Sequence, residues 1–158
     1  LFSQYTVYDY SDIGRYSFGS VWILSIGIDD YGSNKYRNCK SDAISYVDHF
    51  RNSFFQKFRA AREDQFHSYV LLDSAATRQN ILNVLQEIRR NANFNDYFIF
   101  NFSGQSYIYT SDSVTFTTYF HPYEIVGRPE KAAKRDPSTS GELSSQMLSL
   151  HTLQEYIQ

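Results

Sequence analysis

The fold can be read outward from one stretch, Asp96-Tyr97-Phe98-Ile99-Phe100-Asn101-Phe102-Ser103-Gly104-Gln105-Ser106. It opens as an apolar and aromatic run too short for a buried helix and ends in a small, polar turn. A run bounded in this way predicts a central strand buried on both faces, with a loop at its carboxyl end. In open parallel α/β sheets, ligands and catalytic groups collect at that end. A core strand followed by an ordinary turn accounts for the same pattern equally well.

Two apolar runs predict strands that precede this stretch, and two amphipathic segments predict helices between them. Residues 21–28 are nearly continuous in apolar residues, which is typical of a central strand, and residues 66–72 form the next run. One helix is expected from Ser41, a candidate N-cap, with an apolar stripe of Ala43, Ile44, Val47, Phe50 and Phe54. The second is expected after Thr77, its candidate cap, and buries Ile81, Leu82, Val84, Leu85 and Ile88.

Strand and helix alternate along the chain, and this order predicts the fold class. It indicates α/β, with a mostly parallel central sheet flanked by helices and right-handed crossovers. Beyond the opening stretch, we expect a short strand within residues 114–120, a polar loop at 127–146 and a last helix capped by Ser149. Residues 1–20 are interpreted as a lead-in segment on the edge of a single domain, residues 21–158.

Composition excludes several classes of protein. The 158 residues carry a formal net charge of −2, with no basic footprint for nucleic acid. Aromatic residues make up 18% of the chain, which we interpret as padding at the edge of the core. A single Cys excludes an intrachain disulfide framework and suits a reducing compartment. No apolar segment approaches bilayer length and no signal-peptide pattern is present, so a cytoplasmic protein without a membrane partner is expected.

Residues 102–106, Phe-Ser-Gly-Gln-Ser, resemble the F-S-G-H-G signature of the caspase-like cysteine peptidases, which include caspases, metacaspases and bacterial orthocaspases. In that family the His of the motif is the general base and pairs with a Cys on the next strand. Here Gln105 stands in place of the His, and Ser106 in place of the second Gly. Glutamine has no titratable group and cannot take a proton from a thiol. Gln105 therefore holds the catalytic position and is expected to be non-functional there.

Five further stretches resemble the family in the same order along the chain. They are Gly27–Tyr31 (I-G-I-N-x-Y), Asn38–Ala43 (G-C-x-N-D-A), Leu71–Ile81 (L-L-D…A-T-R-E-N-I), Tyr119–Tyr123 (Y-L-x-P-Y/D) and Leu148–Leu153 (I-S-L-x-E-L). The resemblance covers residues 21–158 and implies a caspase-like three-layer sandwich. It also implies that the chain is the large-subunit portion and stops before the family's D-x-C-H-S-G strand, which carries the nucleophile. A fragment, a processed subunit and a truncated chain fit this expectation equally.

The resemblance also assigns a substrate pocket. Asp42 falls on the Asp that binds a basic side chain before the scissile bond in metacaspase-like members, and Ser103 matches another residue of that pocket. A carboxylate in the first turn of a helix explains Asp42 as well. Cys39 falls at a pocket position rather than at the catalytic one, although a thiol ahead of a helix could have thiolate character. His121 is the candidate for a displaced base, but its family position lies in a structural turn.

Three functions are open at this point. The first is a pseudopeptidase with a regulatory, scaffold or peptide-binding role, because Gln105 replaces the base and no nucleophile segment follows. The second is part of an active cysteine endopeptidase that cleaves after a basic residue, present as a fragment or an inactivated variant. The third is a flavodoxin- or receiver-like module, since Asp29 and Asp30 follow the first strand. For the first two, the expected partners are a peptide segment and a second chain that carries the small-subunit half.

Neither a cofactor nor a metal ion is expected. The four His residues have no i, i+4 spacing and form no Cys-His cluster, which are the patterns that metal sites use.

Overall fold

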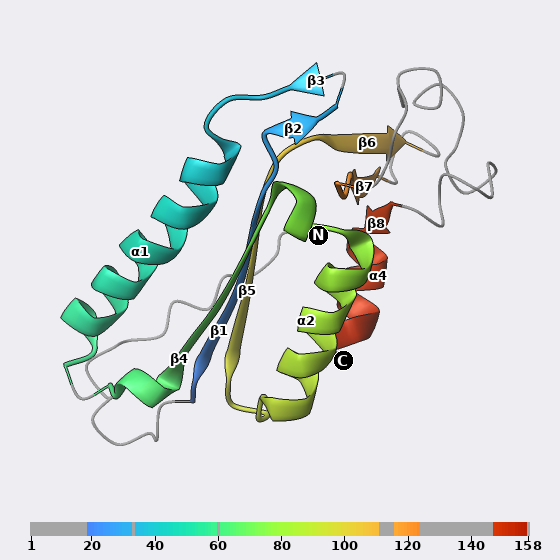
Figure 1. Cartoon of the computed structure of the whole chain (residues 1–158). Coiled ribbons are helices and arrows are strands. Elements are labelled where there is room, and N and C mark those ends of the chain that lie inside the picture. The colour runs from blue at the N-terminus through green and yellow to red at the C-terminus, as the bar shows by residue number, and fades with distance from the viewer. Residues whose placement is uncertain (1–18, 33, 60, 111–115, 124–146, 158) are drawn as a thin grey trace.

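The structure, a computed structural model, describes residues 19–32, 34–59, 61–110, 116–123 and 147–157. Its centre is a parallel sheet of three strands in the order β4-β1-β5 (Figure 1). These strands are β1 (Val21–Gly27), β4 (Phe66–Leu72) and β5 (Tyr97–Ser103). Helices cover the sheet, so the predicted α/β class with a parallel sheet flanked by helices is confirmed.

Strand β1 is the middle of the sheet, as its apolar run predicts. All seven of its residues are buried, and Val21 lies opposite Phe66 on one side and Tyr97 on the other. Ser25 is its polar residue, and its hydroxyl donates to the carbonyl of Ala43 at 2.8 Å. A strand with helices over both faces needs apolar side chains at every position, which this sequence supplies.

Strand β5 differs from the prediction of a central strand buried on both faces. Among the described residues it pairs with β1 alone, and its burial runs from exposed at Tyr97 to half-buried from Phe98 to Ser103. Phe98 and Phe100 pack against the core on one face, whereas Ile99 packs against the core on the other. The apolar run therefore indicated two covered faces correctly, but it carries no information about a second neighbouring strand.

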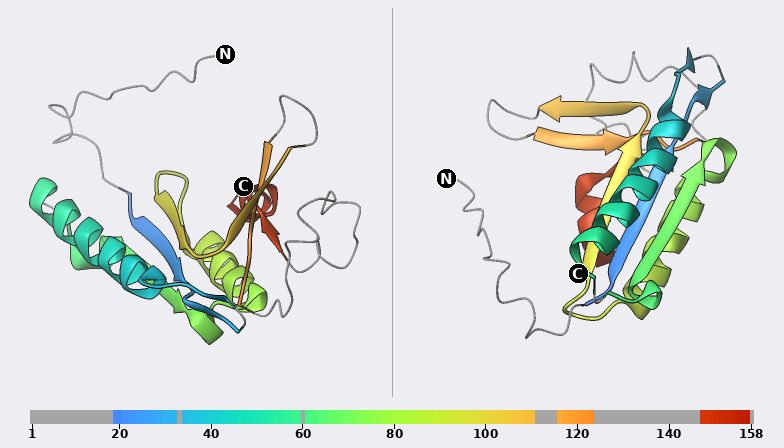
Figure 2. Two further views of the ribbon diagram at one scale, coloured as in Figure 1. Left: turned by 90° about the horizontal axis from the view of Figure 1, so that it is seen from above. Right: turned by 90° about the vertical axis from the view of Figure 1, so that its left-hand side faces the viewer.

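The layers are helix, sheet and helix. Helix α1 (Cys39–Lys57) covers one face, while α2 (Arg78–Asn91) and α4 (Leu150–Ile157) lie side by side on the other (Figure 2). Alternate residues of β1 serve the two faces, because successive side chains of a strand point to opposite sides. Val21 and Ile23 join the cluster under α1, and Trp22, Leu24 and Ile26 join the cluster under α2.

The caps predicted for α2 and α4 are confirmed. The Thr77 hydroxyl accepts from the backbone N–H of Asn80 at 3.1 Å, and the Ser149 hydroxyl accepts from that of Thr152 at 3.0 Å. Each hydroxyl satisfies a backbone donor that the first turn of a helix leaves unpaired. The predicted inner face of α2 is confirmed as well, with Ile81, Leu82, Leu85 and Ile88 buried and Val84 packed against them.

Two predictions for α1 are wrong. The helix begins at Cys39, after Asn38 in the left-handed region (φ 75°), and the Ser41 hydroxyl donates to the Asn38 carbonyl at 2.9 Å instead of capping. Ile44 is 43% exposed, because the buried positions Ala43 and Val47 fix the inner face and the next residue lies about 100° round the helix. Ser41 and Ile44 fit a helix by pattern, but the position of the helix on the sheet determines their roles.

Two small sheets lie at the carboxyl edge of the parallel sheet. Strands β6 (Ser106–Thr110), β7 (Phe116–Phe120) and β8 (Leu148–Ser149) make an antiparallel sheet, and β2 (Asp30–Tyr31) pairs with β3 (Asn34–Lys35). Two 3₁₀ turns, η2 (Glu63–Gln65) and η3 (Asp73–Ala75), lie before and after β4. The short strand expected within 114–120 corresponds to β7, whereas β6 begins at the last residue of the expected turn, Ser106, and was not predicted.

Other expectations fall on residues outside the described ranges. These are the lead-in, of which the structure describes residues 19 and 20, and the polar loop at 127–146. Across the described ranges, every helix is too short or too polar to cross a membrane.

Candidate functional site

Gln105 lies in the two-residue connection between β5 and β6, at the carboxyl edge of the sheet where the sequence places the site. Its side-chain amide donates to the hydroxyl of Tyr107, and its backbone carbonyl accepts from the N–H of His121 at 3.0 Å. The residue is half-buried. The amide is therefore engaged by its own hairpin, and no proton can be taken up at this position at any ordinary pH.

Tyr31 connects Gln105 to the rest of the edge. The sequence placed Tyr31 in the Gly27–Tyr31 stretch but assigned it no role. Its hydroxyl accepts from the backbone N–H of Gln105 at 2.9 Å and donates to the carbonyl of His121 at 3.0 Å. Burial raises the pKa of Tyr31 far above its usual value, so the hydroxyl keeps the proton that it donates. A side chain at Gly104 would place its Cβ 2.5 Å from this hydroxyl, which explains the glycine.

His121, the candidate displaced base, is 1% exposed. Its ring lies against that of Tyr31, with centroids 4.9 Å apart, and 6.3 Å from that of Tyr107. Neither ring nitrogen has a hydrogen-bond partner in the described part of the chain, and burial lowers the pKa of the imidazole to about 4. An imidazole without exposed nitrogens cannot reach a bound substrate, so this geometry suits a structural residue.

Asp42 and Ser103 are brought together although 61 positions separate them. The Ser103 hydroxyl lies 3.5 Å from a carboxylate oxygen of Asp42, at the limit of a hydrogen bond, and the contact is exposed. Asp42 is in the first turn of α1 and Ser103 ends β5. An exposed carboxylate beside a hydroxyl at this edge can accept from an ammonium or guanidinium group.

Cys39 begins α1 and is buried, with 9% of its surface exposed and no disulfide. Its place follows from Gly27 at the end of β1: a Cβ there would lie 2.4 Å from the Cys39 carbonyl oxygen. Only a glycine lets the start of the helix approach so closely. The thiol also lies near enough to Tyr31 to add to the rise in the pKa of that residue.

A charged cluster lies next to these residues, and the sequence analysis gave it no role in a site. The Asp73 carboxylate accepts from the backbone N–H groups of Asp29 and Asp30, at 2.8 and 3.3 Å, and pairs with Lys40 at 2.7 Å. Burial opposes ionisation of Asp73, but the bonds from Lys40 and the two amides outweigh it and lower its pKa. Lys40 also lies 3.9 Å from Asp29, so it partly neutralises the acidic pair.

The described residues contain no group of three or more His, Cys, Asp or Glu side chains that could hold a metal ion. What the edge offers is a carboxylate–hydroxyl pair, a buried thiol and a fixed amide. The carboxylate–hydroxyl pair can bind a cationic side chain, whereas Gln105 supplies no acid or base for chemistry. Two hollows lie at the opposite, amino-terminal end of β5, away from this edge.

No family model and no curated protein matches this sequence. Among solved structures, the crystal structure of protein GSU0716 from Geobacter sulfurreducens is similar, with a TM-score of 0.50 and 16% identity. The similarity covers 72% of this chain and 44% of that one, so this chain spans less than half the length of its structural neighbour. Likeness at this identity concerns the fold alone, and it supports the α/β architecture.

Proposed function

We propose that this chain belongs to a caspase-like domain that binds a peptide segment without cleaving it, as a pseudopeptidase with a regulatory or scaffold role. The observation that carries the proposal is Gln105. It occupies the general-base position of the resembling motif, and its amide is held by the hydroxyl of Tyr107. Loss of the base from a nucleophile–base pair lowers the rate of a protease by orders of magnitude.

The peptide-binding half of the proposal is supported by Asp42 and Ser103. They lie 3.5 Å apart at the carboxyl edge, although the sequence separates them widely. A charge-assisted hydrogen bond from Arg or Lys to such a carboxylate is stronger than a neutral one. The partner proposed is thus a peptide with a basic residue. A second chain carrying the small-subunit half belongs to the same proposal.

Binding tests this half directly. Fluorescently labelled peptides ending in Arg, Lys or Asp are titrated with the protein, and Arg and Lys peptides are expected to bind more tightly. Replacing Asp42→Asn should weaken binding of the Arg peptide by about tenfold, because a charged hydrogen bond is lost. Asp48→Asn is the matched control, since Asp48 is an exposed acid further along the same helix. Equal binding of the Asp and Arg peptides would contradict a pocket that selects basic side chains.

Turnover tests the other half. The same peptides with a chromogenic leaving group should show no hydrolysis above background with the natural protein. Robust hydrolysis that disappears on replacement of a cysteine would overturn the inactive assignment. That outcome would favour the alternative, part of an active endopeptidase that cleaves after a basic residue, which the Asp42–Ser103 pair fits equally well.

A further inference from the structure

His121, the residue after β7, combines a buried ring with a backbone that joins two parts of the fold. The side chain is 1% exposed, and neither ring nitrogen has a hydrogen-bond partner in the described part of the chain. Its backbone N–H donates to the Gln105 carbonyl and its own carbonyl accepts from the Tyr31 hydroxyl, both at 3.0 Å. A buried ring without partners tolerates the neutral imidazole and strongly opposes the charged form.

Two aromatic rings lie near the imidazole. Tyr31 of β2 and Tyr107 of β6 have their ring centroids 4.9 and 6.3 Å from that of His121. The Tyr31 hydroxyl already bonds to the backbone of Gln105 and of His121. An aromatic face attracts a cation weakly, whereas removing a positive charge from water carries a far larger cost. These neighbours therefore do not offset the burial of an imidazolium.

The charged groups on the adjoining elements are engaged away from the ring. Asp73 of η3 pairs with Lys40, and Glu155 of α4 lies 3.3 Å from His151 on the surface. The titratable side chains that act on the β2 tyrosine are Tyr36, Cys39 and Tyr107. Burial lowers the pKa of His121 to about 4, and no charged group of the described residues contributes to this shift. Protonation therefore requires the ring to reach water.

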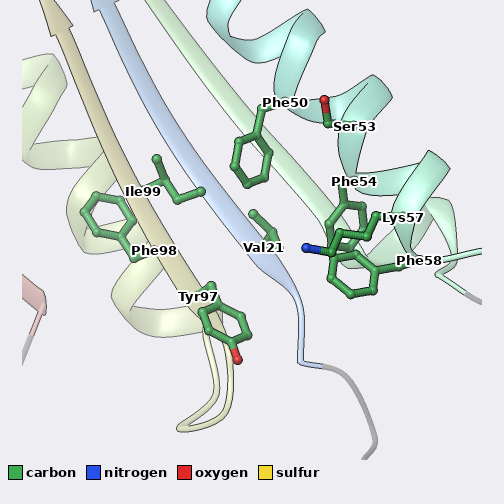
Figure 3. Close-up of a pocket in the computed structure, with 9 residues that line it drawn as sticks. All are labelled: Val21, Phe50, Ser53, Phe54, Lys57, Phe58, Tyr97, Phe98 and Ile99. Carbon is green, nitrogen blue, oxygen red and sulfur yellow. The ribbon is translucent and has the colours of Figure 1, made fainter. Parts of the chain in front are cut away.

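The paired strands β6 and β7 have few attachments to the parallel sheet. Phe120 packs its ring on those of Phe100 and Phe102 in β5, at 5.2 and 5.0 Å between centroids. Strand β7 also pairs with β8 at two positions, and Tyr31 adds its two bonds. The parallel sheet, in contrast, has an extensive core, such as the cluster under α1 around Phe54 (Figure 3). Elements with few buried contacts open at a lower free energy than the core does.

We propose that acid opens this part of the fold: when His121 takes up a proton from solvent, its ring moves from its place beside Tyr31 into water, and β6 and β7 separate from the carboxyl edge while the parallel sheet, α1 and α2 stay folded. Histidine changes its charge in mild acid, and an imidazolium is stable in water but not in a dry site. The backbone of the same residue carries the bonds to Gln105 and Tyr31, so moving the buried ring to water displaces those bonds.

The opening bears on the candidate site. Only Gly104 and Gln105 separate Ser103, the last residue of β5, from β6. Gln105 loses its bond to Tyr31 when the strands open, so the edge beside the Asp42–Ser103 pair is expected to be less ordered in acid. The inference itself concerns the conformation of β6 and β7 and does not require the proposed function.

Amide hydrogen exchange of the natural protein, resolved by residue with NMR, tests the proposal at pH 7.5 and pH 5. Rates are divided by the intrinsic rate at each pH, which leaves the opening equilibrium. With a pKa of about 4 in the closed form and 6.5 in the open form, the opening constant of β6 and β7 should rise about thirtyfold. These amides should also exchange faster than those of β1 at both pH values, and with little dependence on low urea, because a local opening exposes little surface.

Variants assign the response to His121. In His121→Gln no titratable group is left at this position, so the opening of β6 and β7 should change by less than about threefold between the two pH values. His49→Gln, on an exposed residue of α1, should keep the full rise. Tyr31→Phe removes both bonds and should raise the opening constant at pH 7.5 by about tenfold or more.

The expected result is a local opening in acid that depends on His121. Equal protection and equal urea dependence of the β7 and β1 amides would overturn the proposal, since exchange would then occur by global unfolding. A full rise in His121→Gln would assign the response to another group and overturn it as well. An NMR titration of the His121 ring in the natural protein decides the case in which that variant does not fold: a pKa near 4 supports the proposal, and one near 6.5 contradicts it.

Discussion

The hydroxyl of Tyr31 accepts a hydrogen bond from the backbone N–H of Gln105, at 2.9 Å, across 74 positions of sequence. The same hydroxyl donates to the carbonyl of His121 at 3.0 Å. Gln105 and His121 are the residues before β6 and after β7, and they also bond to each other through their backbones. One side chain therefore holds the base of the β6–β7 hairpin against the sheet.

Replacing Tyr31→Phe should destabilise the protein by about 2 kcal/mol, because it removes two hydrogen bonds and leaves buried backbone groups without a partner. Urea unfolding measures the loss, and hydrogen exchange should quicken first at the amides of β6 and β7. Tyr46→Phe is the control on an exposed tyrosine of α1 and should change stability by less than about 0.5 kcal/mol. Equal effects of the two variants would contradict the bridging role.

Because His121 is buried, we expect the free energy of unfolding to fall in mild acid. Its pKa in the folded protein is about 4, below the ordinary value of 6.5, so the folded state binds fewer protons than the unfolded state. Stability is therefore full above about pH 6.5 and falls as the pH approaches 4, by about 2 kcal/mol between pH 7.5 and pH 5. Asp73, whose pKa is lowered, loses its contribution only below its usual value of 3.8.

Urea unfolding across this range checks the prediction. The variant His121→Gln should flatten the pH dependence between pH 7.5 and pH 5, whatever its stability at neutral pH. His49→Gln, on an exposed residue of α1, should leave the slope as it is in the natural protein. An unchanged slope in His121→Gln would assign the pH dependence to other groups.

Asp73 has two roles that different substitutions separate. Its backbone lies in the left-handed region (φ 41°), and its carboxylate accepts from the N–H groups of Asp29 and Asp30. Asp73→Ala should cost about 2 kcal/mol, because both bonds and a residue suited to this conformation are lost. Asp73→Asn keeps an acceptor oxygen and tolerates the conformation, so it should cost roughly half as much. Thermal unfolding compares them, and equal costs would show that the charge alone matters.

Gly27 sets the distance between β1 and the start of α1. The Cβ of Gly27→Ala would lie 2.4 Å from the Cys39 carbonyl oxygen and 2.8 Å from the Lys40 Cα, so the helix must shift. We expect a loss of roughly 2–4 kcal/mol and faster reaction of the Cys39 thiol with a disulfide reagent. A Cβ at Gly32 would meet no neighbouring atom, and only its left-handed backbone (φ 72°) disfavours alanine. Gly32→Ala should therefore lower the free energy of unfolding by roughly 1 kcal/mol. A stable Gly27→Ala with an unreactive thiol would refute this account.

Patterns along the chain predicted much of the fold, and the exceptions have a common cause. The all-apolar run of β1 and the capped stripe of α2 are local properties, and both elements formed as predicted. Ser41 and Ile44 also fit a helix, yet their burial and bonding depend on how α1 approaches the sheet. The strand β6 was missed because the Ser-Gly-Gln-Ser turn that precedes it gives no sign of pairing with β7.

The sequence by itself determined that strands and helices alternate, that β1 is buried along its whole length and that residue 105 carries an amide, which cannot act as an acid or a base. These follow from side-chain chemistry and from spacing along the chain. Only the tertiary structure decided that Asp42 meets Ser103, that Tyr31 joins Gln105 to His121 and that β5 pairs, among the described strands, with β1. Such contacts join residues dozens of positions apart, and they exist only once the packing of helices on the sheet has fixed where each backbone lies.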